Sequence, residues 1–149
     1  MDVAAYLRNA GFADEFPIDP STLNEGQKRR EQVIPMEHPV RGWPGTGVYV
    51  FLKGNRCLYA GCAAANNLVG RALDYLWKEG SRPDVYRGVR EHADRLFLKS
   101  EKTAGAARRL ELRCIVDLEP VLNEGFIYAT DQERLDFGLP PEPDKCPGA

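Results

Sequence analysis

Two tyrosines stand ten residues apart in short apolar stretches of the chain, Tyr49 within 48–52 and Tyr59 within 57–60. If these stretches pair as neighbouring strands, both hydroxyls can reach one edge of a sheet. A phenol is a weak base at its ordinary pKa of about 10. A nearby cation or a metal-bound water lowers that pKa and makes proton abstraction feasible. The pair therefore suits general-base chemistry, and either tyrosine could be the base.

An arginine, a third tyrosine and a glutamate follow where helices are expected. The planar guanidinium of Arg71 can hold two non-bridging phosphate oxygens and offset the charge of a pentavalent transition state. Tyr75, one helical turn later, could reach the same phosphate. Glu111 supplies a hard oxygen ligand, and one carboxylate with phosphate oxygens and waters is an ordinary magnesium site. These residue types indicate metal-assisted cleavage of a phosphodiester.

Each of these residues also has a simpler interpretation. Tyrosines in a hairpin are more often half-buried packing residues than catalysts. Arg71 could be a surface charge, and Glu111 could pair with Arg108 or Arg113 on its own helix. Asn123 by itself would be a turn residue. The chemical interpretation therefore depends on the residues occurring together.

Apolar periodicity predicts the elements that position these residues. The stretches 48–52 and 57–60 are rich in β-branched and aromatic residues around a turn at 53–56, which predicts a β-hairpin. Residues 95–99 alternate polar with apolar as a third strand would. Helical spacing predicts three helices, which cover Asn66 or Asn67 to Gly80, residues 85–92, and Thr103 to Leu118. The last helix is expected to bury one stripe, formed by Ala107, Leu110, Cys114, Ile115 and Leu118.

The fold class expected from this order is α/β, in the α+β sense: a small, three-stranded, mainly antiparallel sheet flanked by helices. Before it, two short helices at 2–9 and 22–33 predict an N-terminal helical extension, and the prolines and glycines of 35–47 predict a loop. Prolines predict an extended or disordered tail past Gly138. We therefore expect three parts, an extension at 1–40, the sheet domain at 41–127, and a partly disordered tail at 128–149.

Charge is segregated along the chain although the net charge is only −2. Residues 41–113 carry 14 Lys and Arg against 7 Asp and Glu. Residues 1–40 carry 4 against 7, and residues 114–149 carry 2 against 8. A basic middle segment suits a nucleic-acid partner if the acidic ends fold away from it. The alternative is a solvated surface on which the signs happen to cluster.

Composition excludes several other classes. No stretch has the roughly 20 apolar residues of a membrane span, and the N-terminus lacks the pattern of a signal peptide, so we expect a cytoplasmic protein with no membrane partner. The cysteines lack the spacing of a zinc site and are expected to be reduced packing groups. They are Cys57, Cys62, Cys114 and Cys146.

Three motifs in order resemble one nuclease family. Gly47-Val48-Tyr49 and Tyr59-Ala60-Gly61, with nine residues between the tyrosines, are similar to the paired tripeptides that name the GIY-YIG nucleases. The segment from Asn67 to Leu73 resembles the family's N-L-x-x-R-x-L helix, which carries its essential arginine. The closing helix is similar too, since Glu111 precedes Pro120 by nine residues and Asn123 by twelve. The matches cover 47–123, about half of the chain.

The resemblance implies a function and a set of site residues. A member of this family would be a metal-dependent endonuclease that hydrolyses DNA, with Mg²⁺ or Mn²⁺ as the metal. The catalytic residues implied are Tyr49, Tyr59, Arg71, Tyr75, Glu111 and Asn123, with Glu111 as the metal ligand. One active site cuts one strand, so double-strand cleavage would require a homodimer or a larger assembly. Substrate, biological role and oligomeric state stay open.

The chain departs from the family pattern at three points. Ten residues rather than eight lead from Gly61 to Arg71, which a longer surface loop accommodates at little cost. Cys62 stands where repair members often have lysine, and Tyr75 stands where some members have histidine. Two other function classes are therefore retained. The chain could bind nucleic acid without cutting it, or it could bind a partner protein through residues 1–40.

Overall fold

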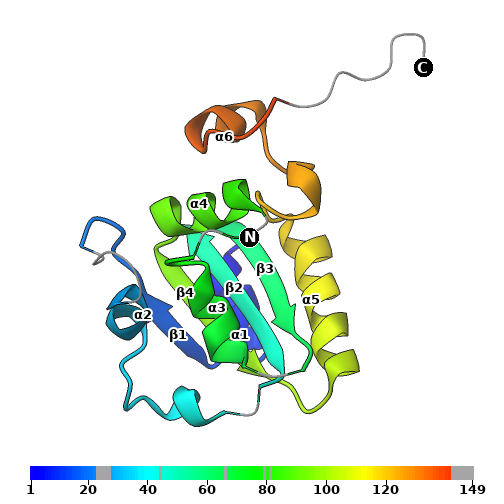
Figure 1. The fold of residues 1–149 in the computed structure, drawn as a ribbon. Coiled ribbons are helices and arrows are strands. Elements are labelled where there is room, and N and C mark those ends of the chain that lie inside the picture. The colour runs from blue at the N-terminus through cyan, green and yellow to red at the C-terminus, as the bar shows by residue number, and fades with distance from the viewer. Residues whose placement is uncertain (23–27, 44, 66, 79, 81, 142–149) are drawn as a thin grey trace.

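In a computed structural model, the protein is described at residues 1–22, 28–43, 45–65, 67–78, 80 and 82–141. A four-stranded antiparallel sheet with the order β1-β4-β2-β3 forms its centre (Figure 1). The strands are β1 (Asp14–Pro17), β2 (Gly47–Lys53), β3 (Arg56–Ala63) and β4 (Arg95–Ser100). Strand β2 is central, and its hairpin partner β3 is an edge strand. The protein is therefore a mixed α/β fold, as expected.

Helices cover both faces of the sheet. They are α1 (Val3–Asn9), α2 (Lys28–Val33), α3 (Leu68–Asp74), α4 (Pro83–His92), α5 (Ala104–Leu118) and α6 (Asp131–Asp136), with the 3₁₀ turns η1 (Pro39–Gly42) and η2 (Glu124–Phe126). Figure 1 shows α3 and α4 on the near face and α5 along the side of β3. Thr103 caps α5, because its side chain accepts a hydrogen bond from the Ala106 backbone N–H. None of the described helices is long and apolar enough to cross a membrane.

Two hydrophobic cores lie on opposite faces of the sheet. One contains Tyr49 and Phe51, which share one face of β2, and joins them to α3, α4 and β1. The other joins Val48 and Val50 to α1 and α5. Since both faces are covered, six of the seven residues of β2 are buried. This double burial explains why the sequence of β2 is a continuous apolar run rather than an alternating one.

The sheet has four strands and not the expected three, because β1 belongs to it. Strand β1 pairs with β4, with Phe16 opposite Leu96, so the N-terminal segment adds a strand as well as helices. The sequence gives little sign of it, since Asp14-Glu15-Phe16-Pro17 is short and half charged. Pro17 is tolerated because β1 lies at the edge of the sheet, where one side needs no ladder hydrogen bonds. The pairing with β4 decides the conformation of this segment.

Several predicted boundaries also shift. Helix α3 ends at Asp74 rather than running to Gly80, because the chain tightens into 3₁₀ turns at Tyr75 and Leu76. Within its stripe, α5 leaves Leu110 only partly buried. The N-cap of α3 is Asn67, and the alternative cap Asn66 lies outside the described residues. Residues 23–27, part of the expected helix 22–33, and the tail from 142 on, with Cys146, also lie outside them.

The segment after α5 is more structured than expected. Helix α6 has a capping box, in which Thr130 and Glu133 each bond the other's backbone N–H. Arg56 on β3 ties this segment to the hairpin. Its guanidinium donates hydrogen bonds to the Glu133 carboxylate at 2.8 Å, to the Glu119 carbonyl at 2.6 Å and to the Tyr128 carbonyl at 3.0 Å. The described part of 128–149 therefore packs against the sheet domain.

If β1 belongs to the cooperative fold, Phe16→Ala should lower the free energy of unfolding by roughly 3 kcal/mol, since Phe16 is 6 % exposed. Val116→Ala is the control, because Val116 is 69 % exposed and should change stability by less than about 0.5 kcal/mol. Denaturant unfolding followed by circular dichroism measures both. Equal stability of the two variants would show that β1 does not contribute.

Candidate active site

A β-bulge brings Tyr49 and Tyr59 to the same face of the sheet. Strand pairing runs regularly from the turn to Leu52 opposite Cys57, and then skips one residue so that Phe51 lies opposite Tyr59. Leu58 is the extra residue, and it shares the core of Tyr59. Side chains alternate between faces, so without the bulge Tyr59 would point to the opposite face from Tyr49. The bulge therefore sets the geometry of the candidate site.

Two glycines at the ends of the hairpin allow close approaches. Tyr49 pairs with Gly61, and a Cβ added at Gly61 would lie 2.5 Å from the Tyr49 hydroxyl. The tyrosine ring thus crosses β3 where no side chain is present. A Cβ at Gly47 would lie 2.2 Å from the Lys99 carbonyl oxygen. Both distances are shorter than a real Cβ atom allows, so steric crowding explains why glycine occupies both motif positions.

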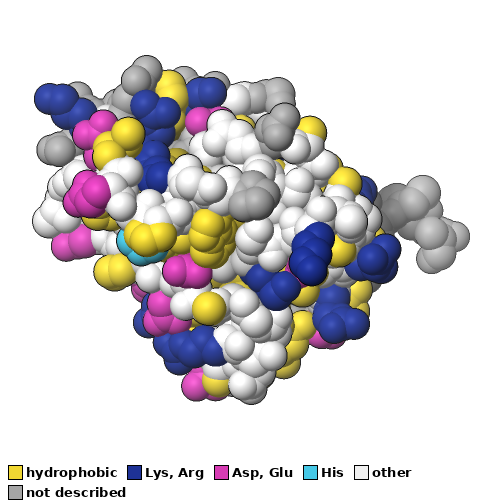
Figure 2. Space-filling view, turned by 90° about the horizontal axis from the view of Figure 1, so that it is seen from below, with side chains coloured by type: hydrophobic (Ala, Val, Ile, Leu, Met, Phe, Trp, Pro, Cys, Tyr) yellow, Lys and Arg dark blue, Asp and Glu magenta, His cyan; other side chains and the backbone are white. Residues whose placement is uncertain are grey.

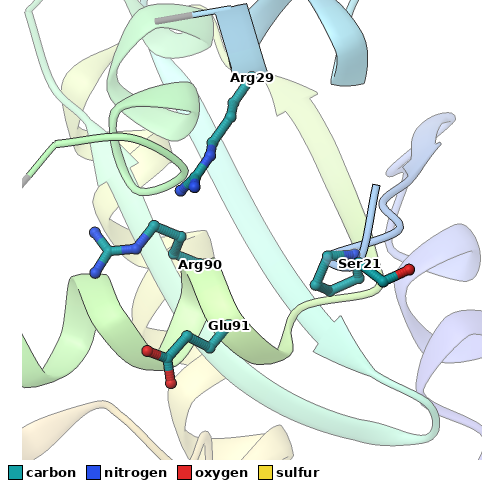
Figure 3. Close-up of a pocket in the computed structure, with 5 residues that line it drawn as sticks. Ser21, Arg29, Arg90 and Glu91 are labelled. Carbon is teal, nitrogen blue, oxygen red and sulfur yellow. The ribbon is translucent and has the colours of Figure 1, made fainter. Parts of the chain in front are cut away.

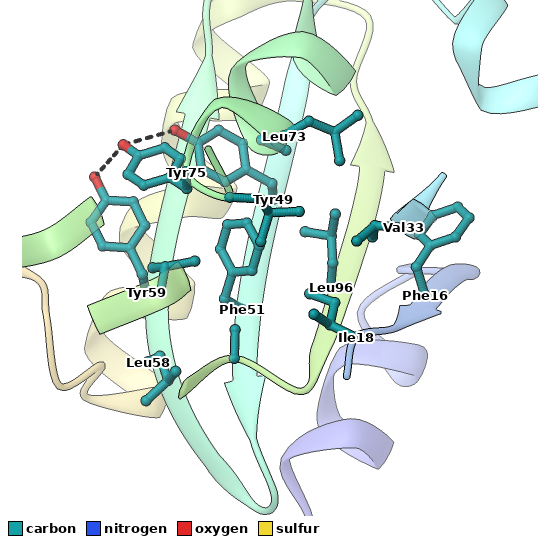
Figure 4. Close-up of a cluster of buried hydrophobic side chains, with 14 of the residues drawn as sticks. Phe16, Ile18, Val33, Tyr49, Phe51, Leu58, Tyr59, Leu73, Tyr75 and Leu96 are labelled. Carbon is teal, nitrogen blue, oxygen red and sulfur yellow. Dashed lines mark hydrogen bonds between the residues drawn. The ribbon is translucent and has the colours of Figure 1, made fainter. Parts of the chain in front are cut away.

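Three tyrosine hydroxyls meet at this face (Figure 4). The hydroxyl oxygens of Tyr49 and Tyr75 are 3.4 Å apart, and those of Tyr75 and Tyr59 are 3.2 Å apart. Both distances exceed the usual range for hydroxyl pairs, so these are weak hydrogen bonds. The Tyr75 ring also stacks on Tyr86 of α4, with centroids 4.4 Å apart. We call Tyr49, Tyr59 and Tyr75 the tyrosine cluster.

Arg82 joins the cluster and was not predicted. Its guanidinium donates hydrogen bonds to the Tyr59 hydroxyl at 2.8 Å and to the Tyr75 hydroxyl at 3.2 Å. It also lies over the Tyr59 ring, with 5.6 Å to the centroid. Pro83 occupies the first turn of α4, which starts the helix there and leaves Arg82 in the preceding N-cap position. The Arg-Pro pair before a helix is the only sequence signal, and it is a weak one.

Arg71 of α3 is a second cation near the cluster. Its charge acts on the Tyr49 hydroxyl and lowers the pKa of that group against the effect of burial. Both Arg71 and Arg82 are exposed residues, whereas the tyrosines are 2–5 % exposed. The site therefore consists of buried phenols whose hydroxyls meet two solvent-accessible cations. Such a pair of cations suits an anionic ligand such as a phosphate group.

Burial sets the acidity of the three phenols. Removal from water raises the pKa of Tyr49, Tyr59 and Tyr75 above the ordinary value of 10.0. The charge of Arg71 acts in the opposite direction on Tyr49, and that of Arg82 does so on Tyr59 and Tyr75. The phenols are therefore protonated at neutral pH and act as hydrogen-bond donors.

Asn123 supports the site from the edge of the sheet. Its side-chain amide accepts a hydrogen bond from the Ala60 backbone N–H at 2.9 Å and donates one to the Ala60 carbonyl at 2.8 Å. The backbone of Val121 and Leu122 bonds to the same edge of β3. Ala60 lies between Tyr59 and Gly61, so Asn123 fixes the backbone that carries them. Its described contacts make it a positioning residue.

Glu111 lies next to the cluster's strand rather than among its hydroxyls. The carboxylate interacts with the Cys62 thiol, the residue after Gly61, and lies 3.7 Å from the Arg108 guanidinium. Burial and then the charge of Glu111 raise the pKa of Cys62. The Glu111 side chain is 13 % exposed. Tyr49 and Glu111 thus approach neighbouring positions of β3, Gly61 and Cys62, and Cys62 packs against the core opposite to that of Tyr49.

The described residues include no group of three or more His, Cys, Asp or Glu side chains able to hold a metal ion. A metal at Glu111 would therefore need ligands from water and substrate. That donor set is compatible with magnesium, which commonly binds one or two carboxylates together with substrate phosphates. The 3.7 Å separation from Arg108 also leaves the Glu111 carboxylate only weakly paired.

A surface pocket lies away from these residues. It is lined by Pro20, Ser21, Arg29, Arg90 and Glu91 and has a volume of about 500 Å³. Figure 3 shows Arg29 entering from α2 and Arg90 and Glu91 from α4. No member of the tyrosine cluster lines it. Its mixed charges and exposed walls give no reaction chemistry.

The sequence-predicted residues thus separate into two groups. Tyr49, Tyr59, Tyr75 and Arg71 come together, whereas Asn123 and Glu111 contact the strand that carries Tyr59. Comparisons with protein-family models, with curated proteins and with solved structures found no match. The functional argument therefore depends on the site's own geometry.

The steric role of Gly61 can be tested. Gly61→Ala should force the Tyr49 ring from its position and lower the free energy of unfolding by about 1–3 kcal/mol. Gly42→Ala is the matched control, because an added Cβ there meets nothing within 4 Å and stability should be almost unchanged. Thermal unfolding and near-ultraviolet circular dichroism measure the two effects. If both variants are equally stable with the wild-type tyrosine signal, Tyr49 does not cross β3 at Gly61.

The buried phenols also predict a pH dependence of stability. Because burial raises their pKa, the folded protein keeps protons at a pH where the unfolded chain loses them. Their contribution is fully present below the unfolded pKa of about 10 and is lost as pH rises toward the folded pKa. The free energy of unfolding should therefore decrease above pH 10, less steeply in Tyr59→Phe. Denaturant unfolding over an alkaline series measures this, and an identical slope in Tyr59→Phe would contradict it.

Proposed function

We propose that the protein is a metal-dependent endonuclease of the GIY-YIG type, which hydrolyses phosphodiester bonds in DNA. The observation that carries this proposal is the meeting of three tyrosine hydroxyls with Arg71 and Arg82. Nucleophilic attack on a phosphodiester needs a proton acceptor beside cations that neutralise the phosphate. A tyrosine that has lost its proton can be the acceptor, and Arg82 donates hydrogen bonds to two of the three hydroxyls.

The chain's own residues suggest a division of labour. Arg71 and Arg82 would bind the non-bridging oxygens of the scissile phosphate and orient it over the hydroxyls. One tyrosine would first release its own hydroxyl proton to solvent. A water would then attack phosphorus, transfer a proton to that phenolate oxygen and displace the leaving oxygen, which takes a proton from solvent. Tyr59 is the better acceptor on geometry, because Arg82 donates to it directly at 2.8 Å and would stabilise a phenolate. The charge of Arg71 acts on Tyr49 in the same direction.

Glu111 is the residue that would hold magnesium or manganese. When bound, the metal would supply positive charge near the leaving oxygen and strengthen the acidity of nearby groups. Its position beside Cys62 puts this charge next to the strand of the tyrosine cluster. Such a charge would offset the burial that raises the pKa of the phenols.

Surface charge supports a polyanionic substrate. Figure 2 shows one group of Lys and Arg side chains at the right of the view and another at the upper left, with Asp and Glu side chains between them. Lys99, Arg109 and Arg113 line one pocket of about 310 Å³, accompanied by Glu101. Such a surface would attract the phosphates of a polyanion at a strength that falls with salt.

Cleavage of labelled duplex and branched DNA with magnesium or manganese tests the proposal. Glu111→Ala and Arg71→Ala should each lower the rate by at least about 100-fold, because each removes charge stabilisation of the transition state. Glu37→Ala is the control for a lost surface carboxylate and should stay within about twofold of wild type. The proposal fails if wild type leaves every substrate intact, or if Glu111→Ala cuts at the wild-type rate.

A second candidate is a domain that binds nucleic acid without cutting it. The near-complete burial of the tyrosines favours it, because burial holds the phenols in their protonated form. Salt-dependent DNA binding that is unchanged by metal and never followed by cleavage would support this alternative.

A further inference from the structure

A small pocket lies directly beside the tyrosine cluster. It has a volume of about 200 Å³ and lies between the first turn of α4 and the turn that follows the Val121–Asn123 segment. Its walls include Arg82, Asp84, Leu122, Glu124 and Phe126. Pockets for drug-sized ligands have roughly 300–1,000 Å³, so this one suits a single planar ring rather than a whole nucleotide.

Arg82 is shared by the pocket and the cluster. It lines the pocket and donates hydrogen bonds to the hydroxyls of Tyr59 and Tyr75. A group bound in the pocket therefore contacts one side of the Arg82 guanidinium, while the tyrosine hydroxyls contact the other. If the phosphate of a ligand contacts Arg82, the part of the ligand next to that phosphate would enter this pocket.

The lining favours a neutral ring over another phosphate. Phe126 packs against the core and Leu122 is 1 % exposed, which provides an apolar wall. The carboxylates of Asp84 and Glu124 lie on the same pocket and would repel a second phosphate. Asp84 is paired with Arg87 at 2.7 Å. Among the described residues no basic side chain pairs with Glu124, so its carboxylate can accept a hydrogen bond from a ligand N–H.

The turn that forms one wall is held in an unusual conformation. Glu124, Gly125 and Phe126 have φ values of 54°, 67° and 68°, in the left-handed region. Non-glycine residues adopt this conformation at a free-energy cost, and such positions are concentrated at ligand sites. The backbone of the turn is held at both ends of Phe126, because its N–H donates to the Asn123 carbonyl and its carbonyl accepts from Arg134. The position from which the Phe126 side chain starts is therefore fixed.

We propose that this pocket binds one nucleobase of the DNA strand being cut, next to the scissile phosphate. This inference rests on the proposed nuclease function and deepens it. The base stacks on Phe126, and an exocyclic amino group donates to the Glu124 carboxylate. Asn123 begins the strained turn and also fixes Ala60 beside Tyr59. The same residue thus sets the distance between the base pocket and the hydroxyls.

Two measurements test the base pocket. The first compares cleavage of DNA that carries cytosine or an abasic site at each nucleotide flanking the cut. Wild type should cut the cytosine substrate about 5–150-fold faster at one position, which is the range for stacking of one base. Phe126→Ala should remove this ratio, and Phe126→Leu, which keeps an apolar side chain, should reduce it. Ile127→Ala, an exposed neighbour outside the pocket, should keep the ratio.

The second measurement is independent of cleavage. The backbone amide of Gly125 is followed by nuclear magnetic resonance during titration with a cytosine dinucleotide and with its abasic counterpart. A shift of Gly125 that requires the base supports the pocket even if wild type cuts nothing, in which case only the nuclease proposal fails. If cleavage occurs at equal rates with and without the base, or if Gly125 responds to neither dinucleotide, the pocket inference is overturned.

Discussion

The extra residue at Leu58 is the constraint on which the candidate site depends. A hairpin closed by a Gly54-Asn55 turn has only one regular register, and that register places Tyr59 opposite Val50. The bulge moves Tyr59 opposite Phe51 and Tyr49 opposite Gly61. One unpaired residue therefore decides which of the two cores receives the second phenol. The consequence extends to Tyr75 and Arg82, because both hydrogen-bond to groups that the bulge has brought to this face.

Local sequence signals predicted most of the fold and part of the site. Apolar runs and turn residues predicted the hairpin and β4, and the apolar spacing with Thr103 predicted α5. The relation of Arg71 to the hairpin tyrosines was also predictable, because both belong to motifs with readable spacing. These signals succeed where neighbouring residues determine the conformation.

The remaining features depend on contacts between distant segments. Strand β1 forms because β4 offers an edge, and its four residues have no strong strand preference. The bulge at Leu58 follows from the packing of Leu58 and Tyr59 in one core. Arg82 reaches Tyr59 only because α4 starts at Pro83 beside β3. Glu111 lies beside Cys62 and Asn123 bonds to Ala60, so both act on the strand that carries Tyr59. The apolar periodicity and the motif spacing of the sequence do not predict these contacts between distant segments.

The separation of the two cores by the sheet allows the two helical layers to change independently. Arg71 lies on α3 and Arg82 directly precedes α4, while α1 and α5 stabilise the opposite face through a different set of apolar side chains. Substitutions in one layer leave the packing of the other intact, provided that β2 keeps its alternation between faces. Such a chain can acquire new ligand contacts on the tyrosine side while the apolar side chains of α1 and α5 keep the opposite core packed.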